Sequence, residues 1–340
     1  MNKHWTADAL FELVRGFQPA CVLGAAADLD LFSALATKPL TAPAVARKLK
    51  ADLRALTILL DALTALGLLR KQSGRYTVPR DGAALLTDRS PASVLPMMQH
   101  QAHCLRRWSQ LAETVRSGRP PRRTASVRGA AADYAAFIGA MHVINAPSAD
   151  QVIRGIKPLR FGHLLDVGGA SGTWTMAFLR ACPAATATLF DLPPVLPLAR
   201  KRLAAAGLLR RVTLASGDFL KDTLPAGADM AWVSAIVHQN SRAQNRHLFA
   251  NVRQALVPGG RIAIRDILMA ESRTAPVMGA LFAVNMLVGT RGGGTFTLAE
   301  LRADLVSAGF CRVKLARPDN AMDTVVTAVR SASQVSCGCQ

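Results

Sequence analysis

Apolar residues recur at helical spacing through much of the chain from about residue 9 to residue 80, as in residues 20–32. Thr41 and Asp52 each precede an apolar run and are typical residues at helix starts. The helix that follows Asp52 is expected to stop at Gly67, since glycine is common just beyond a helix C-terminus. Residues 68–78 then predict two short strands around a Ser-Gly turn. Helices followed by a strand pair are the order of a winged helix.

The helix predicted over residues 52–66 stands where a winged helix would read DNA. It offers one basic side chain, Arg54, and is otherwise mainly apolar. Contact with base edges in the major groove needs several exposed polar or basic side chains. The helix therefore predicts packing, in the core of its own domain or against another subunit.

The hydrophobic pattern changes at about residue 155. Before it, residues 91–150 predict helices around a Pro- and Arg-rich segment, residues 118–126, which is a solvated loop or a lid. After it, short apolar runs alternate with helices, and the candidate strands are residues 163–167, 187–190, 212–215, 230–233 and 261–265. This alternation predicts an α/β fold with a mostly parallel sheet covered on both faces. Ligands of such sheets bind at the carboxyl ends of the strands.

A glycine-rich turn, residues 166–172, follows the first of these strands. Gly168, Gly169 and Gly172 would let a ligand approach the backbone closely. A nicotinamide dinucleotide is an alternative ligand, but its usual spacing is Gly-x-Gly-x-x-Gly. Asp166, at the strand end, suits the cationic amino-acid end of S-adenosylmethionine and would repel a pyrophosphate. The turn therefore favours S-adenosylmethionine as the cofactor.

Two more acids end the next two strands. Asp191, followed by Leu192, lies at about the distance downstream expected of a carboxylate that holds ribose hydroxyls. Asp218 can accept a hydrogen bond from the adenine amino group, while Phe219 packs on the ring. Each acid alone could be a helix cap, but acids at three successive strand ends strengthen the interpretation as a cofactor site.

His238 comes just after the fourth strand, on the ligand-binding side of the predicted sheet. An imidazole there can remove a proton from an acceptor hydroxyl, because it changes protonation state near neutral pH. The alternative is a histidine at a helix start that takes no part in chemistry.

Five segments in this order resemble the metal-independent, S-adenosylmethionine-dependent O-methyltransferases of small molecules: residues 166–172, 190–193, 217–219, His238 and 256–260. That family includes acetylserotonin, caffeate and many bacterial natural-product methyltransferases. The resemblance covers nearly the whole chain. It implies a Rossmann-like S-adenosylmethionine-methyltransferase domain preceded by an α-helical winged-helix dimerisation domain, and an intertwined homodimer.

The resemblance also assigns roles to single residues. It implies that His238 is the catalytic base and that Asp266 is the acid that orients it. The chain departs from the family pattern at four positions: Gln239 and Asn240 follow the histidine in place of Asp-Trp, Thr295 stands where a second acid is common, and Ser234 replaces a cofactor-contacting lysine. Most of these departures concern the acceptor chemistry.

Two predicted helices would line the acceptor pocket by the same resemblance. The residues expected there are Met141, His142, Asn145, Phe282, Asn285 and Met286, with Arg291 beyond them. Met or Phe at helical spacing is equally typical of a protein core. Arg265, Arg273 and Arg291 flank these segments and would either attract an acidic substrate or face solvent.

Composition sets limits on partners and location. The net charge of +19 fits a polyanionic partner, an anionic small acceptor or well-solvated faces. Nucleic acid is not expected, because no aromatic residues interleave with the basic ones. The six cysteines lack metal-ligand spacing apart from the pair Cys337 and Cys339, so no bound metal is expected. Without a long apolar stretch or a signal-peptide pattern, the chain is expected to be cytoplasmic and free of the membrane.

The 340 residues predict more than one domain. The expected boundaries are a winged-helix dimerisation domain over 1–100, a helical linker contributing to the substrate pocket over 101–154, a Rossmann-like domain over 155–330 and a tail over 331–340. The expected reaction is methyl transfer from S-adenosylmethionine to a hydroxyl of a small molecule. Two alternatives stay open: S-methylation of a small anionic thioether or thiol, and a winged-helix DNA-binding regulator.

Overall fold

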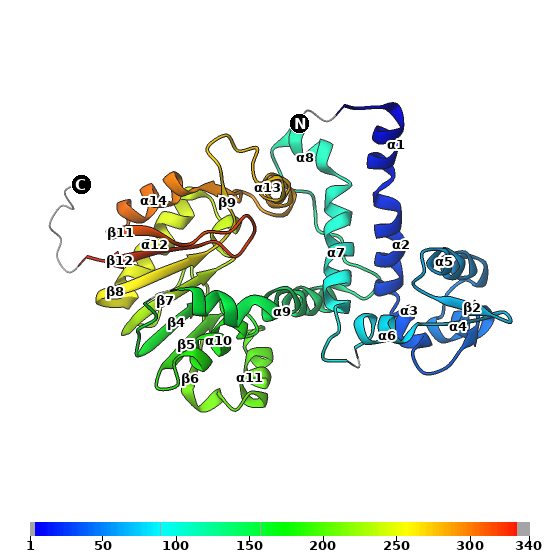
Figure 1. Cartoon of the computed structure of the whole chain (residues 1–340), viewed down its shortest axis with the longest axis horizontal. Coiled ribbons are helices and arrows are strands. Elements are labelled where there is room, and N and C mark those ends of the chain that lie inside the picture. The colour runs from blue at the N-terminus through cyan, green and yellow to red at the C-terminus, as the bar shows by residue number, and fades with distance from the viewer. Residues whose placement is uncertain (1–3, 89, 157, 332–340) are drawn as a thin grey trace. The chain divides into compact units, whose positions relative to one another are not determined.

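The computed structural model describes residues 4–88, 90–156 and 158–331, and these form two compact units. Of these described residues, unit 1 comprises those within 1–109 and 123–144, and unit 2 comprises those within 110–122 and 145–340. The predicted linker over 101–154 is therefore shared between the units, and helix α9 (Ala130–Gly155, Figure 1) contributes to both. Cys337 and Cys339, in the predicted tail, lie outside the described residues.

Unit 1 combines helices with one small sheet. Strands β1 (Leu40–Thr41), β3 (Arg75–Thr77) and β2 (Arg70–Gln72) pair antiparallel in that order. The helices are α1 (Ala7–Arg15), α2 (Phe17–Asp28), α3 (Leu31–Leu35), α4 (Ala42–Leu49), α5 (Leu53–Ala65), α6 (Arg80–Leu86) and α7 (Leu95–Trp108). Helix α4 begins after Thr41, and the Asp52 carboxylate caps α5 by accepting the Ala55 N–H at 2.8 Å. Both predicted helix starts and the predicted strand pair are confirmed.

Helix α5 buries one apolar stripe and exposes another. Leu56, Leu60 and Leu63, spaced at one helical turn, are buried in the core of unit 1. Full burial of such a side chain stabilises the fold by about 1.5–3 kcal/mol. Leu53 and Ile58 are exposed on the same helix. The expectation that this helix serves packing is confirmed for its first stripe.

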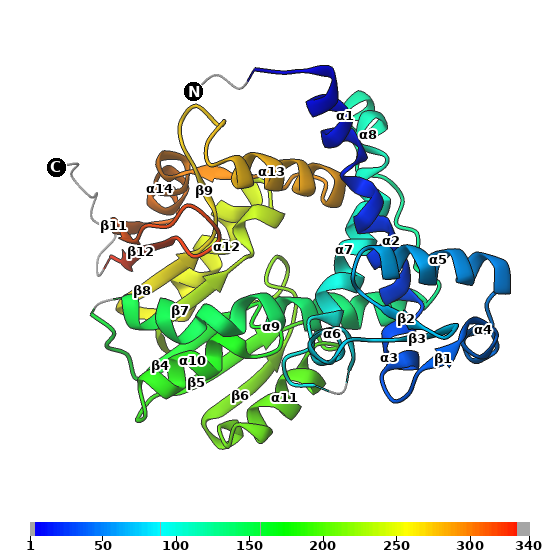
Figure 2. The same cartoon turned by 45° about the vertical axis from the view of Figure 1, so that its right-hand side comes forward.

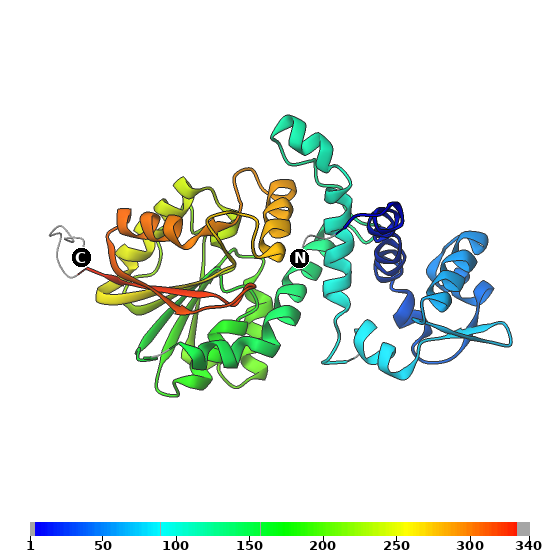
Figure 3. The ribbon, with the colours of Figure 1, turned by 45° about the horizontal axis from the view of Figure 1, so that its top comes forward.

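Unit 2 is built on a seven-stranded sheet in the order β11-β12-β8-β7-β4-β5-β6. Its strands are β4 (His163–Val167), β5 (Thr186–Asp191), β6 (Val212–Ser216), β7 (Ala228–Ser234), β8 (Leu256–Arg265), β11 (Phe310–Arg317) and β12 (Val325–Arg330). The five predicted strands are all present and pair in parallel. Strands β11 and β12, which pair antiparallel along one edge (Figure 3), were not predicted.

Helices cover both faces of this sheet (Figure 1), as predicted. Helices α12 (Arg242–Ala255) and α14 (Leu298–Ser307) contribute to one core, and α9 and α10 (Thr173–Ala181) to the other. Alternate strand residues supply the two cores, since successive side chains point to opposite faces. The remaining elements are α8 (Leu111–Ser117), α11 (Leu196–Ala205), α13 (Val277–Gly289), the short helices η1 (Leu209–Arg211) and η2 (Val237–Gln239), and the strand pair β9 (Leu268–Met269) and β10 (Phe296–Thr297). None of the helices within the described ranges has both the length and the apolar character needed to cross a membrane.

Candidate active site

The carboxyl ends of the parallel strands meet at one edge of unit 2 (Figure 2). The glycine turn follows β4, Asp191 ends β5, and η2 with His238 follows β7. Asp266 follows β8, which pairs with β7 in parallel register. The topology therefore brings the predicted cofactor acids and the predicted base to the same edge.

The turn after β4 requires glycine at several positions. Gly168 and Gly172 have φ angles of +68° and +80°, a region that favours glycine. A Cβ on Gly168 would lie 2.6 Å from the side chain of Ile236, and one on Gly169 would lie 2.6 Å from Leu189. Side chains at these positions would overlap their neighbours. The glycines therefore let the turn pack closely against Ile236 and Leu189, and its contact with a ligand stays a prediction.

Asp191 is tied to this turn by both of its carboxylate oxygens. One accepts the N–H of Ala170 and the other accepts the N–H of Leu192, each at 2.7 Å. Burial raises the pKa of Asp191, and the two backbone donors oppose that rise. A carboxylate offers about four lone-pair sites. Acceptor capacity therefore remains for ribose hydroxyls, as the predicted role requires.

Asp166 lies deeper than its place at a strand end suggests. It is 1% exposed, and the Thr175 hydroxyl donates to its carboxylate at 2.5 Å. Burial raises the pKa of Asp166 to about 7; the Thr175 hydroxyl opposes the rise and the nearby Asp191 adds to it. A cation close to this carboxyl would favour its ionised form. Its contact with the cofactor stays a prediction.

We expect Asp166 to make the ligand-free protein less stable as the pH rises from about 4 to about 7. In this window the folded chain keeps a proton on Asp166, whose pKa is about 7, while the unfolded chain has released it. The free energy of unfolding therefore falls with pH through this group. Across this range, the stability of the wild-type protein relative to Asp166→Asn, measured by urea unfolding, should fall as the pH rises. Equal slopes for the two proteins would contradict the raised pKa.

The third strand-end acid, Asp218, is engaged within its own loop. Its carboxylate pairs with Lys221 at 2.8 Å and accepts the Leu220 N–H at 3.0 Å. The Lys221 contact is the main cause of a lowered pKa of Asp218. The Phe219 ring lies 3.7 Å from where a Cβ on Gly168 would be, so it borders the glycine turn. The predicted adenine contacts of Asp218 and Phe219 stay predictions.

Ser234 and Arg265 interact at the ends of β7 and β8. The Arg265 guanidinium donates to the Ser234 hydroxyl at 3.2 Å and forms an ion pair with Asp323 at 2.6 Å. Arg265 is 3% exposed and lies over the Trp174 ring at 4.5 Å. The alternative that Arg265 faces solvent is wrong, because the residue is buried beside the Asp323 carboxylate, and its attraction for an acidic substrate stays a prediction. The predicted cofactor contact of Ser234 stays a prediction.

His238 and Asp266 form a buried pair. Nδ1 of His238 lies 2.8 and 3.0 Å from the two carboxylate oxygens of Asp266. The carboxylate also accepts the main-chain N–H groups of His238 and Ile267, at 3.2 and 2.8 Å. A carboxylate can only accept, so the Nδ1 nitrogen carries the proton in the neutral ring and Nε2 is the basic nitrogen. Nε2 has no hydrogen-bond partner among the described residues.

Two further segments fix the surroundings of His238. The Phe282 ring, on α13, meets the imidazole edge to face at 4.7 Å between ring centroids. The N–H of Gly294 donates to the His238 carbonyl at 2.9 Å. A side chain on Gly293 would overlap the same carbonyl. The glycine run at 292–294, for which no role was predicted, thus packs on the main chain of His238.

The other predicted acceptor residues are distributed over both units. Asn285 and Met286 share α13 with Phe282, and Arg291 is exposed beyond that helix. Met141 and His142 belong to unit 1, and Asn145 is a buried residue of unit 2. Their contacts with an acceptor stay predictions.

Thr295 and Arg273 are engaged with neighbouring residues. Thr295 is buried, and its carbonyl accepts a hydrogen bond from Arg273 at 3.1 Å. Arg273 also forms an ion pair with Glu300. These partners give Arg273 a structural role at the start of α14.

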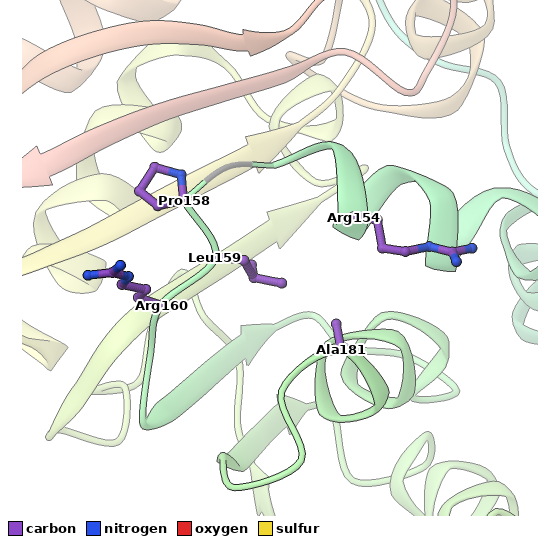
Figure 4. Close-up of a pocket in the computed structure, with 5 residues that line it drawn as sticks. All are labelled: Arg154, Pro158, Leu159, Arg160 and Ala181. Atoms are coloured by element: carbon purple, nitrogen blue, oxygen red, sulfur yellow. The ribbon is translucent and has the colours of Figure 1, made fainter.

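A surface pocket of unit 2 lies away from this edge. Figure 4 shows its lining by Arg154, Pro158, Leu159, Arg160 and Ala181. These residues come from the end of α9, the segment before β4 and the end of α10. Since Leu159 and Arg160 precede β4, the pocket is at the amino end of that strand. It is separate from the carboxyl-end site.

Comparisons with known proteins identify two family models in the chain. An O-methyltransferase domain matches residues 108–311, and an O-methyltransferase dimerisation domain matches residues 11–88. The 3-hydroxy-5-methyl-1-naphthoate 3-O-methyltransferase of Streptomyces sahachiroi is 33% identical over 315 residues, covering 91% of this chain and 90% of that protein.

Comparison with solved structures also finds proteins described with S-adenosylmethionine or S-adenosylhomocysteine (SAM or SAH). Human N-acetylserotonin methyltransferase in complex with SAM has a TM-score of 0.78 at 26% identity, covering 97% of this chain and 99% of that one. The structure described as PigF with SAH has a TM-score of 0.83 at 26% identity, covering 96% and 100%. The glycine turn and the strand-end acids are the features of this chain that were predicted to bind such a cofactor. The chain therefore belongs to the O-methyltransferase family and is an S-adenosylmethionine-dependent methyltransferase with an N-terminal dimerisation domain.

Proposed function

We propose that the enzyme methylates a hydroxyl group of a small aromatic molecule, with His238 as the general base. The observation that carries this proposal is the buried His238–Asp266 pair, in which Asp266 occupies Nδ1 and leaves Nε2 without a partner among the described residues. The proton of the acceptor hydroxyl passes to Nε2. The acceptor oxygen then carries the negative charge needed for attack on a methyl group.

Asp266 performs two tasks in this scheme. It fixes the imidazole in the tautomer with a basic Nε2, and its negative charge stabilises the imidazolium that forms. The main-chain N–H donors of His238 and Ile267 hold the carboxylate in place. A ring that is already oriented loses little freedom when the acceptor binds.

The glycine turn and Asp191 are the proposed holders of the cofactor. Bound S-adenosylmethionine supplies the methyl group, on a reactive sulfonium. Gly168, Gly169 and Gly172 let it approach the main chain, and Asp191 accepts from its ribose hydroxyls. Asp166 provides a carboxyl near the end of β4 that an ammonium group would ionise.

A hydroxylated aromatic acceptor is supported by the wall beside the base. Phe282 presents an aromatic surface next to the imidazole, and Met286 lies one turn further along α13. The relative from Streptomyces sahachiroi is named as acting on 3-hydroxy-5-methyl-1-naphthoate, a hydroxylated aromatic acid. A flat hydroxylated ring is thus the acceptor class that this site favours.

Paired acceptors test this proposal. The enzyme is incubated with methyl-labelled S-adenosylmethionine and a panel of hydroxylated naphthoates and polyketide-like phenols, each beside the same compound with the hydroxyl already methylated. We expect label on the free hydroxyl compound and none on its blocked partner, measured by mass spectrometry. Label on a thioether, thiol or amine analogue, with none on any hydroxyl, would contradict hydroxyl methylation.

A homodimer is part of the proposal. The matched dimerisation domain includes part of α1, where Phe11, Leu13 and Val14 are exposed together with Leu10 and Phe17 nearby. A second copy of the chain is the proposed cover for this apolar helix. Light scattering should give twice the 36.1 kDa chain mass at low micromolar concentration. A monomer mass there would refute it.

A further inference from the structure

Arg265 lies between β7, the strand that leads to His238, and the loop of Asp323 and Thr324, which contacts the main chain of Asp266. It ends β8, where it pairs in register with Ser234 of β7 on one side and Val325 of β12 on the other. Its side chain contacts Ser234 at 3.2 Å and Asp323 at 2.6 Å. Three strands therefore meet at this one buried residue.

Main-chain hydrogen bonds link the segments of Arg265 and Asp323 to the segments that carry His238 and Asp266. Its carbonyl accepts the N–H of Ala235 at 2.9 Å, three residues before His238. The N–H of Asp266 donates to the carbonyl of Thr324 at 3.1 Å. Thr324 directly follows Asp323, the ion-pair partner of Arg265. The ion pair thus holds the Thr324 loop against the strand end that carries Asp266.

The charges of this cluster leave room for one proton. With a neutral His238, the positive charge of Arg265 faces the negative charges of Asp323 and Asp266, and Asp319 adds to them, so the cluster is net negative. A buried net charge is costly in a low-dielectric interior. Proton uptake by His238 reduces this net negative charge. Burial lowers the pKa of Arg265 and its acidic neighbours oppose this, while a guanidinium remains protonated throughout.

Few other charged groups face His238 from the elements around it. Helix α13 has no titratable residue, and the glycine run contributes the exposed Arg291 at its start. Helix α12 begins with Arg242, whose charge is satisfied by Asp304. Asp319, in the loop before β12, also interacts with Arg265. Arg265 and Asp323 are therefore the ion pair next to the catalytic carboxylate.

We propose that Arg265 and Asp323 are positioning residues that set the charge balance of the His238–Asp266 pair, and so the pH at which His238 takes up its proton. The effect of this charge balance on catalysis rests on the proposed role of His238 as the general base. The pH at which His238 takes up its proton can be measured in the ligand-free protein. This inference and the proposed function can therefore be contradicted separately.

A double-mutant cycle followed by histidine NMR tests this inference. The protein is labelled at the histidine Cε1 carbons, and the His238 signal is assigned by its loss in His238→Asn. Arg265→Gln makes the cluster more negative, so the titration midpoint of His238 should rise by at least about 0.5 pH unit. Asp323→Asn makes it less negative, so the midpoint should fall by a similar amount. The exposed His247 serves as the internal control and should keep its midpoint.

The double variant and the conservative variant complete the test. Arg265→Gln combined with Asp323→Asn restores the net charge, so the midpoint should return close to the wild-type value. Arg265→Lys keeps the charge and should shift the midpoint less than Arg265→Gln. Asp323 is 20% exposed in its side chain, so Asp323→Asn is the mild variant that keeps the test informative if Arg265 variants unfold.

Shifts of opposite sign distinguish an electrostatic role from a purely structural one. Loss of packing alone would loosen the site in both single variants and would not reverse the sign between them. Equal midpoints in wild type and Asp323→Asn, or shifts of the same sign in both single variants, would overturn the proposal. A confirmed pair of shifts in a protein whose His238→Ala variant retains full activity would support this inference and refute the base.

Discussion

Replacing His238 with alanine is expected to lower the single-turnover rate of methyl transfer by about a hundredfold to ten-thousandfold. The physical reason is the loss of Nε2, the basic nitrogen that takes the acceptor proton. Binding of S-adenosylhomocysteine should stay within about twofold of wild type, because His238 is not among the proposed cofactor residues. Quenched-flow measurement with a hydroxyl acceptor gives the rate, and calorimetry gives the affinity.

Two variants calibrate this result. His247→Ala removes an exposed histidine of α12 and should leave the rate unchanged. Asp266→Asn keeps the shape of the partner but loses its charge, so it should slow the same step less than His238→Ala does. A wild-type rate in the His238→Ala enzyme would contradict the role of His238 as the general base. His238 would then be a buried histidine of η2 that takes no part in the chemistry.

Replacing Asp191 with alanine is expected to weaken binding of S-adenosylhomocysteine by roughly tenfold to a hundredfold. A hydrogen-bonding group that carries charge contributes about 1.5–3 kcal/mol, which corresponds to that change in affinity. The variant also releases the N–H groups of Ala170 and Leu192, so part of the loss comes from a less ordered glycine turn. Calorimetric titration of the two purified proteins measures the difference.

Asp229 provides a matched control in the same sheet. Its carboxylate likewise accepts two main-chain N–H groups, those of Gly162 and His163 at 2.8 and 3.0 Å, but at the amino end of β4. Asp229→Ala should therefore lower stability much as Asp191→Ala does and leave cofactor affinity unchanged. Equal affinities of the wild-type protein and Asp191→Ala for S-adenosylhomocysteine would contradict the role of Asp191 in cofactor binding.

Local patterns along the chain predicted most of the fold. The apolar runs that became β4 to β8 are short, buried and separated by helices, so their periodicity and length identified them. Asp191 stands at a strand end, and parallel pairing alone brings it beside the glycine turn. The buried contact between His238 and Asp266 followed from the family resemblance, since 28 residues separate them.

Contacts between distant segments account for what was missed. Strands β11 and β12 pair antiparallel at the edge, where no helix follows each strand to mark it. Arg265 and Asp323 are 58 residues apart, and nothing in either local sequence indicates that they pair. The glycine run at 292–294 did carry a signal, because three adjacent glycines suggest a close backbone approach.

The pH dependence of single-turnover methyl transfer in the wild-type enzyme, with saturating cofactor and a hydroxyl acceptor, tests the role of His238 as base. If the imidazole takes the acceptor proton, the rate should fall at low pH as the ring becomes protonated and should reach a plateau at higher pH. The His238→Ala enzyme should lose this dependence along with its rate. A wild-type rate that stays flat across neutral pH, as expected for an acceptor with no proton to lose, would contradict general-base catalysis by His238.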